Sequence, residues 1–464
     1  RFDLPISDEE VENLSFYKPP TDSPEIQYME ERRKSLGGYL PIRKQKGNSL
    51  KIPSLSNFSN VLTTTGNREI STTMAFVRIL STLVRDDEIG KYVVPIVPDE
   101  ARTFGMEGMF RQLGIYSSIG QLYEPQDADQ VMFYKEQKDG QILEEGINEA
   151  GSFSSWIAAA TSYSNTGIQT IPFYIFYSMF GFQRIGDLAW AAGDSRARGF
   201  LLGATAGRTT LNGEGLQHED GHSHLISATI PNCISYDPCF AYELAVIIQN
   251  GLERMIQNQE DVYYYITLMN ENYQHPDMPK NIEKNIVQGI YQFSESKFKG
   301  PKVQLMGSGV ILREVIEAAK LLETEWDISA DIYSVTSFTE LRREALDIER
   351  WNMLNPDKKD KMSIIQETIS DQESPIIAST DYMKSYAEQI SNFLPNKFIS
   401  LGTDGFGRSD SREALRNFFE VDRYFIIIAS LKALVDSKKI NKDLLSKAIK
   451  KYKINGNKAN PVST

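Results

Sequence analysis

Apolar residues along the chain alternate between short continuous runs and longer stretches with helical spacing. The short runs are rich in Val, Ile, Leu, Phe and Tyr and predict buried strands at 92–97, 170–176, 199–206, 232–237 and 261–270. Between them, helical spacing predicts helices at 68–86, 146–164 and 241–256. In the first helix, Met74, Val77, Leu80 and Leu83 mark the expected buried face. Buried strands that alternate with helices indicate a parallel sheet covered on both faces.

A second alternating set follows a polar stretch at 271–300, which holds Pro276, Pro279 and Gly300 and predicts a linker. The second set has expected strands at 302–309, 327–338, 374–380 and 397–407, a helix at 310–326 and closing helices after Tyr424. We therefore predict an α/β chain with two doubly wound sheet domains. Their predicted limits are a connecting segment at 1–65 with a short helix at 24–36, a first domain at 66–285 and a second at 300–464.

Composition narrows the classes of partner. The 464 residues carry a net charge of −12 and show no basic stripe, so we expect no nucleic-acid partner. The longest apolar run, 425–434, is interrupted by Lys432 and is shorter than the ~20 residues that cross a bilayer, so we expect no membrane partner. Two cysteines in so long a chain favour a reducing compartment, and we expect a cytoplasmic protein. Because the chain begins with Arg1 and a polar stretch, we expect a fragment or a processed piece.

The stretch NGEGLQHEDGHSH at 212–224 holds three of the four histidines, His218, His222 and His224. It contains an H-E-x-x-H match, which binds zinc in metalloproteases when it lies on a helix. The glycines of the stretch and its lack of apolar periodicity disfavour a helix. Three interpretations stay open from the residues alone: the polar lining of a cleft, zinc bound from a loop, and a structural loop.

Other polar and aromatic residues follow neighbouring strands. Glu100 comes just after the strand at 92–97, Tyr177 and Phe180 follow the strand at 170–176, and Glu149 lies near the start of the helix at 146–164. Ligands of open parallel sheets bind at the carboxyl ends of the strands, where these residues and the histidine stretch are expected to meet. The alternative for Glu149 is a charge at the start of a solvated helix. The alternative for Tyr177 and Phe180 is core packing.

Long strings resemble the homodimeric bacterial pyruvate dehydrogenase family, the decarboxylating first component of the pyruvate dehydrogenase complex. They are DEARTFGMEGMFRQLGIY, ILEEGINEAG, IPFYIFYSMFGFQRIGDLAWAAGDSRARGF, GRTTLNGEGLQHEDGHSH, YSVTSFTELRRE, STDYMKSYAEQI and GTDGFGRSDSREALRNFFEVD. The resemblance implies a transketolase-like aminopyrimidine-binding domain followed by a transketolase C-terminal-like domain.

The resemblance also implies thiamine diphosphate and Mg²⁺ as cofactors. The family binds the diphosphate and the metal through a G-D-G motif in a further domain, and this sequence contains no G-D-G. We therefore expect no metal ligands in this chain and a missing diphosphate-binding domain.

By resemblance, Glu149 matches the glutamate that hydrogen-bonds N1′ of the aminopyrimidine, a role that requires a buried carboxyl group. Phe180 matches the aromatic ring that stacks on the aminopyrimidine, and Tyr177 matches a neighbouring active-site tyrosine. Glu100 matches a second active-site acid. His218 matches a histidine on the substrate side, where it binds the substrate or moves protons. The roles of His222, His224 and Glu214 stay open.

The function implied is decarboxylation of pyruvate with acetyl transfer to the lipoyl group of dihydrolipoyl acetyltransferase. The family acts as a homodimer, with its active site between the diphosphate domain of one subunit and the aminopyrimidine domain of the other. One alternative is a transketolase that acts on sugar phosphates. Another is a catalytically incomplete fragment, or a dimerising half that needs a separate diphosphate-binding chain.

Overall fold

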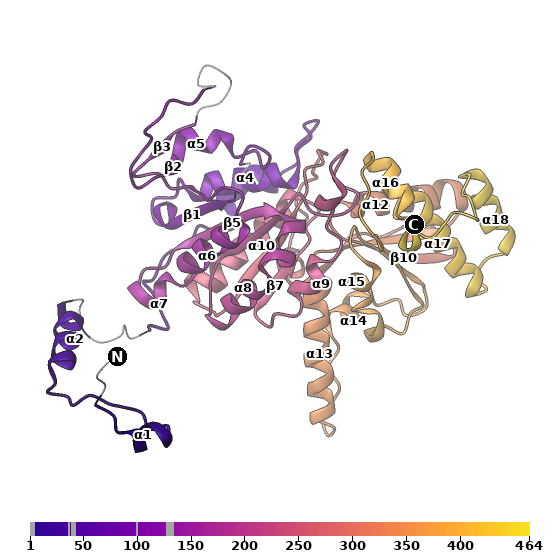
Figure 1. Ribbon diagram of the computed structural model, residues 1–464. Coiled ribbons are helices and arrows are strands. Elements are labelled where there is room, and N and C mark those ends of the chain that lie inside the picture. The colour runs from indigo at the N-terminus through magenta and orange to yellow at the C-terminus, as the bar shows by residue number, and fades with distance from the viewer. Residues whose placement is uncertain (1–4, 36–37, 39–42, 99–100, 127–133) are drawn as a thin grey trace.

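Two parallel-sheet units dominate the structure, a computed structural model that describes residues 5–35, 38, 43–98, 101–126 and 134–464 (Figure 1). The first sheet has the order β4-β1-β5-β6-β8-β7, and every neighbouring pair in it is parallel. Its strands are β1 (Val93–Val97), β4 (Leu143–Glu144), β5 (Ile171–Tyr177), β6 (Phe200–Ala204), β7 (Cys233–Tyr236) and β8 (Tyr263–Leu268). The continuous burial of β5, β6 and β8 explains why these strands read as unbroken apolar runs.

Helices pack on the first sheet in two groups. Helix α6 packs on β1 and β5 and against α8, whereas α10 packs against α3 and α4. These helices are α3 (Ser59–Leu62), α4 (Thr72–Leu83), α6 (Glu149–Ala160), α8 (Phe182–Asp194) and α10 (Ala241–Leu252), which continues into a π turn, η5 (Glu253–Gln257). The predicted doubly wound α/β fold is confirmed.

The predicted buried face of α4 is confirmed at Leu80 and Leu83 and wrong at Met74, which is exposed, and Val77, which is half-buried. The buried side chains are Phe76, Ile79, Leu80 and Leu83, whereas Met74 is 36% exposed. Both stripes have helical spacing, so the sequence pattern alone did not decide between them. The aromatic ring of Phe76 packs against Phe173 of the sheet, with ring centroids 5.7 Å apart.

The second sheet has the order β13-β12-β10-β11-β9, with β9 antiparallel to β11 and the other pairs parallel. Its strands are β9 (Ile290–Ser294), β10 (Lys302–Gly307), β11 (Ser329–Val335), β12 (Ile376–Ser379) and β13 (Phe398–Leu401). The prediction of a linker over 271–300 is therefore wrong in its second half, where α11 (Glu283–Gln288) and β9 lie. Only two residues of β9, Ile290 and Tyr291, are buried. The pattern of apolar residues therefore did not predict this edge strand.

The remaining elements surround the two sheets, and the N-terminal segment with α1 and α2 stands off from them (Figure 1). Helix α13 extends away from the second sheet. The described helices not yet named are α1 (Asp8–Glu12), α2 (Pro24–Ser35), α5 (Glu107–Leu113), α7 (Ser162–Thr166), α9 (Ser223–Ser227), α12 (Ile311–Trp326), α13 (Phe338–Leu354), α14 (Ile364–Thr368), α15 (Lys384–Glu388), α16 (Arg412–Phe418), α17 (Arg423–Asp436) and α18 (Lys442–Lys451). Short 3-10 turns are η1 (Leu55–Phe58), η2 (Gly90–Tyr92), η3 (Ser178–Phe180), η4 (Leu216–His218), η6 (Ser391–Phe393) and η7 (Pro461–Ser463), and β2 (Ile115–Tyr116) pairs with β3 (Glu136–Gln137). Across the described parts of the chain, no helix has both the length and the apolar character needed to cross a bilayer.

The two sheets meet at their carboxyl edges. Asp237 follows β7, and its backbone N donates to Thr336 O, just past β11, at 2.8 Å. Its carbonyl accepts from Gly309 N, just past β10, at 3.0 Å. The loops that leave the first sheet at this edge are therefore in contact with the second sheet.

Candidate active site

The predicted site residues that the structure describes lie beyond the carboxyl ends of the first sheet's strands. Tyr177 is the last residue of β5, Phe180 ends the turn η3, and His218 ends the turn η4 after β6. Glu149 is the first residue of α6, which follows β4. Glu100 follows β1 but lies outside the described residues.

Rings from the β5 end and from the histidine stretch form one cluster. The imidazole of His218 stacks on Tyr177 with centroids 4.9 Å apart and rings inclined by 23°, and it meets Phe180 edge-on at 5.1 Å. Phe104 contacts the ring of Tyr177 at 5.6 Å. Tyr177 and Phe180 are only partly buried, so they line a surface and are not part of the core.

Glu149 is held at the start of α6 and is only 9% exposed. The side chain of Asn148 caps the helix by accepting from Gly151 N at 3.0 Å. Glu149 Oε1 accepts from Arg184 Nη1 at 2.7 Å, and the same guanidinium lies 4.0 Å from the centroid of the Phe180 ring. Arg184 thus contacts both Glu149 and Phe180, the two residues that the family resemblance assigns to the aminopyrimidine ring.

Arg184 was missed in the sequence, although a signal existed. It lies four residues after Phe180, in the first turn of α8, and its guanidinium lies over the Phe180 ring. The residue type gave no reason to prefer it over Arg196 or Arg198 in the same string. Only the fold shows that Arg184 is the one that faces Glu149.

The histidine stretch does not form the helix that a zinc peptidase requires. His218 ends a 3-10 turn, and His222 precedes the separate helix α9. His222 Nε2 lies 2.7 Å from Gln183 Nε2, whereas His224 is fully buried with Nε2 3.0 Å from Thr267 Oγ1. The three side chains have different surroundings, and in the described ranges no three His, Cys, Asp or Glu side chains converge on one possible metal position. Glu214 lies beside His218, with Oε2 3.4 Å from Nδ1.

The second domain holds residues 208–210, which lead into the histidine stretch. Asp381, just past β12, is fully buried and accepts from Thr209 Oγ1 and Thr210 Oγ1, both at 2.7 Å, and from Thr209 N at 3.1 Å. Arg208 Nη1 donates to Thr403 O, in the loop after β13. The wall of the candidate site is therefore built from the first domain and supported by the second.

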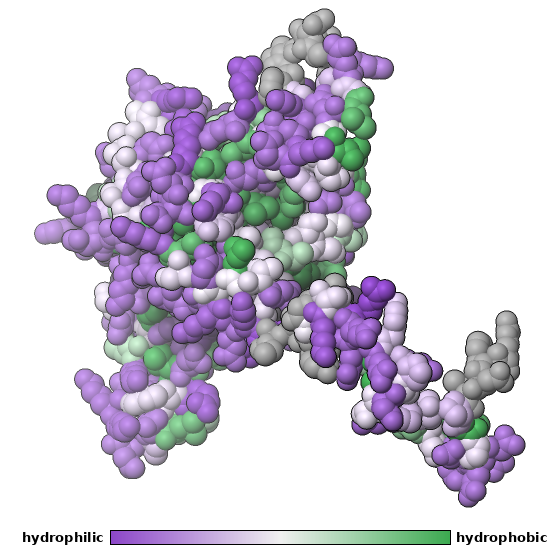
Figure 2. Space-filling model, turned by 90° about the vertical axis from the view of Figure 1, so that its left-hand side faces the viewer, coloured by the Kyte–Doolittle hydropathy of each residue, from purple (hydrophilic) through white to green (hydrophobic). Residues whose placement is uncertain are grey.

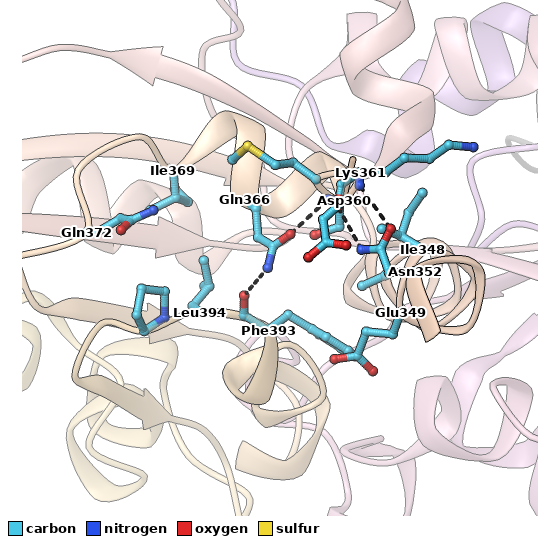
Figure 3. Close-up of a pocket in the computed structure, with 14 residues that line it drawn as sticks. Ile348, Glu349, Asn352, Asp360, Lys361, Gln366, Ile369, Gln372, Phe393 and Leu394 are labelled. Carbon is cyan, nitrogen blue, oxygen red and sulfur yellow. Dashed lines mark hydrogen bonds between the residues drawn. The ribbon is translucent and has the colours of Figure 1, made fainter. Parts of the chain in front are cut away.

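A cavity of about 330 Å³ in the second domain lies apart from these residues (Figure 3). Its walls come from α13, the loop before α14, α14 and the turn near Phe393. Asn352 on α13 exchanges two 2.9 Å hydrogen bonds with the backbone of Lys361, and Gln366 on α14 donates to Phe393 O at 3.1 Å. None of the site residues named above lines this cavity.

Comparison with known proteins defines the class of the chain. Residues 50–276 match the pyruvate dehydrogenase E1 component middle domain, and residues 289–422 match the transketolase-like C-terminal domain. The fold is shared with transketolase from Leishmania mexicana, with a TM-score of 0.61 at 16% identity over 83% of this chain and 48% of that one. A split gene transketolase, solved as an inactive beta4 tetramer, matches with a TM-score of 0.53 at 16% identity over 79% of this chain and 98% of that one.

The relatives identify the family within that class. The chain is 62% identical to a pyruvate dehydrogenase E1 component of Pseudomonas aeruginosa over 100% of this chain and 53% of the relative. It therefore belongs to the pyruvate dehydrogenase E1 component family, and it spans about half the length of the curated relatives it matches.

Proposed function

We propose that this chain provides the aminopyrimidine side of a thiamine diphosphate-dependent pyruvate dehydrogenase. The whole enzyme decarboxylates pyruvate and passes the acetyl group to the lipoyl group of dihydrolipoyl acetyltransferase. The observation that carries the proposal is the meeting of Glu149 and Phe180 at one edge of the sheet, joined by a planar cation. We further propose a cytoplasmic location, which the two buried free cysteines support.

The residues present fit an aminopyrimidine ring. The Phe180 ring already accepts a flat cationic group at 4.0 Å, so stacking partners of this shape and charge suit it. Glu149 is buried, and its carboxylate accepts a hydrogen bond from Arg184 Nη1 at 2.7 Å. His218 is partly exposed, and its Nδ1 is buried 3.4 Å from Glu214 Oε2.

Thiamine diphosphate, when bound, supplies a carbanion nucleophile and an electron sink for decarboxylation. In our proposal Glu149 shares a proton with ring atom N1′. Phe180 fixes the plane of the ring, and Tyr177 fixes His218 by stacking. His218 then faces the substrate, where it binds the pyruvate carboxylate or moves a proton. Glu100 completes the proposed set of acids.

We propose that Mg²⁺ and the diphosphate are held by residues other than these 464. The sequence contains no G-D-G motif, and no acidic metal cluster forms among the described residues. A homodimer would bring such residues to this edge from a partner subunit. Figure 2 shows hydrophobic surface on one face of the molecule, and exposed apolar residues such as Ile119, Leu122 and Ile147 support contact with a further protein surface.

A second candidate is that the chain acts only as a structural half and needs a separate diphosphate-binding chain. The fold match to the split gene transketolase chain, of which 98% is covered, supports this candidate. The predicted sugar-phosphate alternative is not favoured, because the middle-domain match is to pyruvate dehydrogenase E1 components.

The test is CO2 release from carboxyl-labelled pyruvate with thiamine diphosphate and Mg²⁺. The chain is assayed alone and in a reconstituted mixture with the diphosphate-binding half of a related pyruvate dehydrogenase. We expect release only in the mixture. Release by the chain alone would contradict the proposed need for outside residues, and a mixture that assembles but releases no CO2 would contradict the function itself.

A further inference from the structure

The histidine stretch contacts a segment of the second domain, residues 402–410, between β13 and α16. Glu219, next to His218, is fully buried, and its Oε2 accepts from Arg408 N at 2.5 Å. Five residues before His218, Gly213 N donates to Asp410 O at 3.0 Å. Two hydrogen bonds to the 402–410 segment therefore lie on either side of His218.

Gly407 is the point of closest approach between these two parts of the chain. A Cβ atom there would lie 2.6 Å from Leu216 O and 2.9 Å from the Cβ of Glu219. Both distances are below van der Waals contact, and the first neighbour is backbone, which cannot rotate away. The turn η4, which ends in His218, therefore rests directly on the backbone of the second domain.

Within the described residues, the His218 side chain has little else to fix it. It contacts the rings of Tyr177 and Phe180, and its Nδ1 lies 3.4 Å from Glu214 Oε2. The orientation of the imidazole thus depends on where the backbone of η4 lies, and Glu219 and Gly407 set that position.

The surroundings of Glu219 favour its neutral form. Its Oε1 is buried and has no hydrogen-bond partner among the described residues, and an ionised oxygen would be costly there. Burial raises the pKa of Glu219 to about 8, opposed by the Arg408 backbone N–H and the Arg208 guanidinium and reinforced by the Asp381 carboxylate. A neutral carboxyl group still accepts the Arg408 N–H hydrogen bond.

We propose that Glu219 is a positioning residue: by binding the Arg408 backbone against Gly407, it holds His218 on the rings of Tyr177 and Phe180. The inference deepens the proposed function and rests on it, because it gives the second domain a part in a reaction at the first domain's edge. The acetyl-transfer chemistry itself stays with the residues already described.

Histidine NMR tests the position of the ring without any cofactor. The chain has only four histidines, so His218 can be assigned by the signal lost in His218→Gln. Stacking on Tyr177 displaces its ring-proton shifts from those of a free histidine. We expect Gly407→Ala and Glu219→Ala to move the His218 signal toward the free value and to leave His275 in place. Glu219→Gln keeps a neutral acceptor and should retain the wild-type shift, and Gly456→Ala, which adds a Cβ in open space, is the matched control.

Kinetics of the reconstituted mixture then link position to reaction. We expect kcat to fall about tenfold in Glu219→Ala, with rescue in Glu219→Gln, and KM for pyruvate to change less. A wild-type His218 signal in both Gly407→Ala and Glu219→Ala would overturn the inference, as would a Glu219→Gln signal like that of Glu219→Ala. If Gly407→Ala does not fold, the two Glu219 variants decide. A mixture without activity but with the expected NMR pattern would contradict the proposed function and leave the positioning role intact.

Discussion

The carboxyl edges of the two sheets have the same construction and different uses. At the first edge, Tyr177, Phe180 and His218 stay partly exposed, and Glu149 is reached by Arg184. At the second edge, Asp381 and Thr403 are buried and bind residues 208–210, just before the histidine stretch. Ligands of parallel sheets bind at this edge, and at the second sheet the position is taken by residues 208–210 of the chain itself.

The difference teaches that a site can be divided between an edge that reacts and an edge that supports. The first edge is rich in rings and charges that suit a cofactor, whereas the second offers one carboxylate to a Thr-Thr pair. Variants at the second edge should therefore change stability first, and variants at the first edge should change chemistry first.

The largest effect on stability is expected for Asp381→Ala. The substitution leaves the hydroxyls of Thr209 and Thr210 and one backbone N–H buried without their acceptor. We expect the free energy of unfolding to fall by about 3 kcal/mol. Urea unfolding measures it, with the exposed Asp357→Ala as control. Equal urea midpoints for Asp381→Ala and Asp357→Ala would contradict the supporting role of the second edge.

A kinetic difference is expected within the histidine stretch. In the reconstituted mixture we expect His218→Ala to lower kcat/KM for pyruvate about 100-fold, in the range of lost acid–base or oxyanion groups. His222→Ala should lower it less than threefold, because His222 contacts Gln183 outside the ring cluster. The opposite ranking would identify His222 as the reacting histidine in place of His218.

The pH dependence of stability gives the next effect. Because the folded state raises the pKa of Glu219 to about 8 from an ordinary value near 4.5, folded chains hold a proton there that unfolded chains lose. This contribution is complete below pH 4.5 and is lost as the pH rises to 8. When the pH rises from 5.5 to 8, the free energy of unfolding of the wild type should fall. In Glu219→Gln, which has no titrating group at this position, the fall should be smaller by about 2 kcal/mol. Parallel pH curves for the two proteins would place an ionised carboxylate at Glu219.

The smallest effect concerns the stacking ring. We expect Phe180→Leu to weaken thiamine diphosphate binding in the reconstituted mixture about fivefold, the equivalent of about 1 kcal/mol of aromatic contact. Calorimetric titration measures it, and Phe406→Leu, an exposed ring on the 402–410 segment, is the control. A larger loss of affinity in Phe406→Leu than in Phe180→Leu would contradict the proposed cofactor position at the first sheet.

The sequence predicted the reacting edge better than the supporting one. Runs such as 170–176 and 199–206 are buried strands, and their carboxyl ends bring Tyr177, Phe180 and His218 together as expected. Periodicity reports only local burial, so it did not reveal that Glu219 meets Arg408, 189 residues away. For the same reason α13 and β9 went unpredicted, since one is polar on most faces and the other is half exposed. The limits of the two domains and the roles of the site residues stay predictions.

The most direct test of the central claim is the effect of Glu149→Gln on CO2 release from carboxyl-labelled pyruvate in the reconstituted mixture. The matched control is Glu107→Gln, which also changes the first residue of a helix, α5, but at an exposed position. We predict a loss of at least about 100-fold for Glu149→Gln, with thiamine diphosphate still bound, and wild-type rates for Glu107→Gln. Equal rates for the two variants would contradict the claim that this edge of the first sheet activates the cofactor.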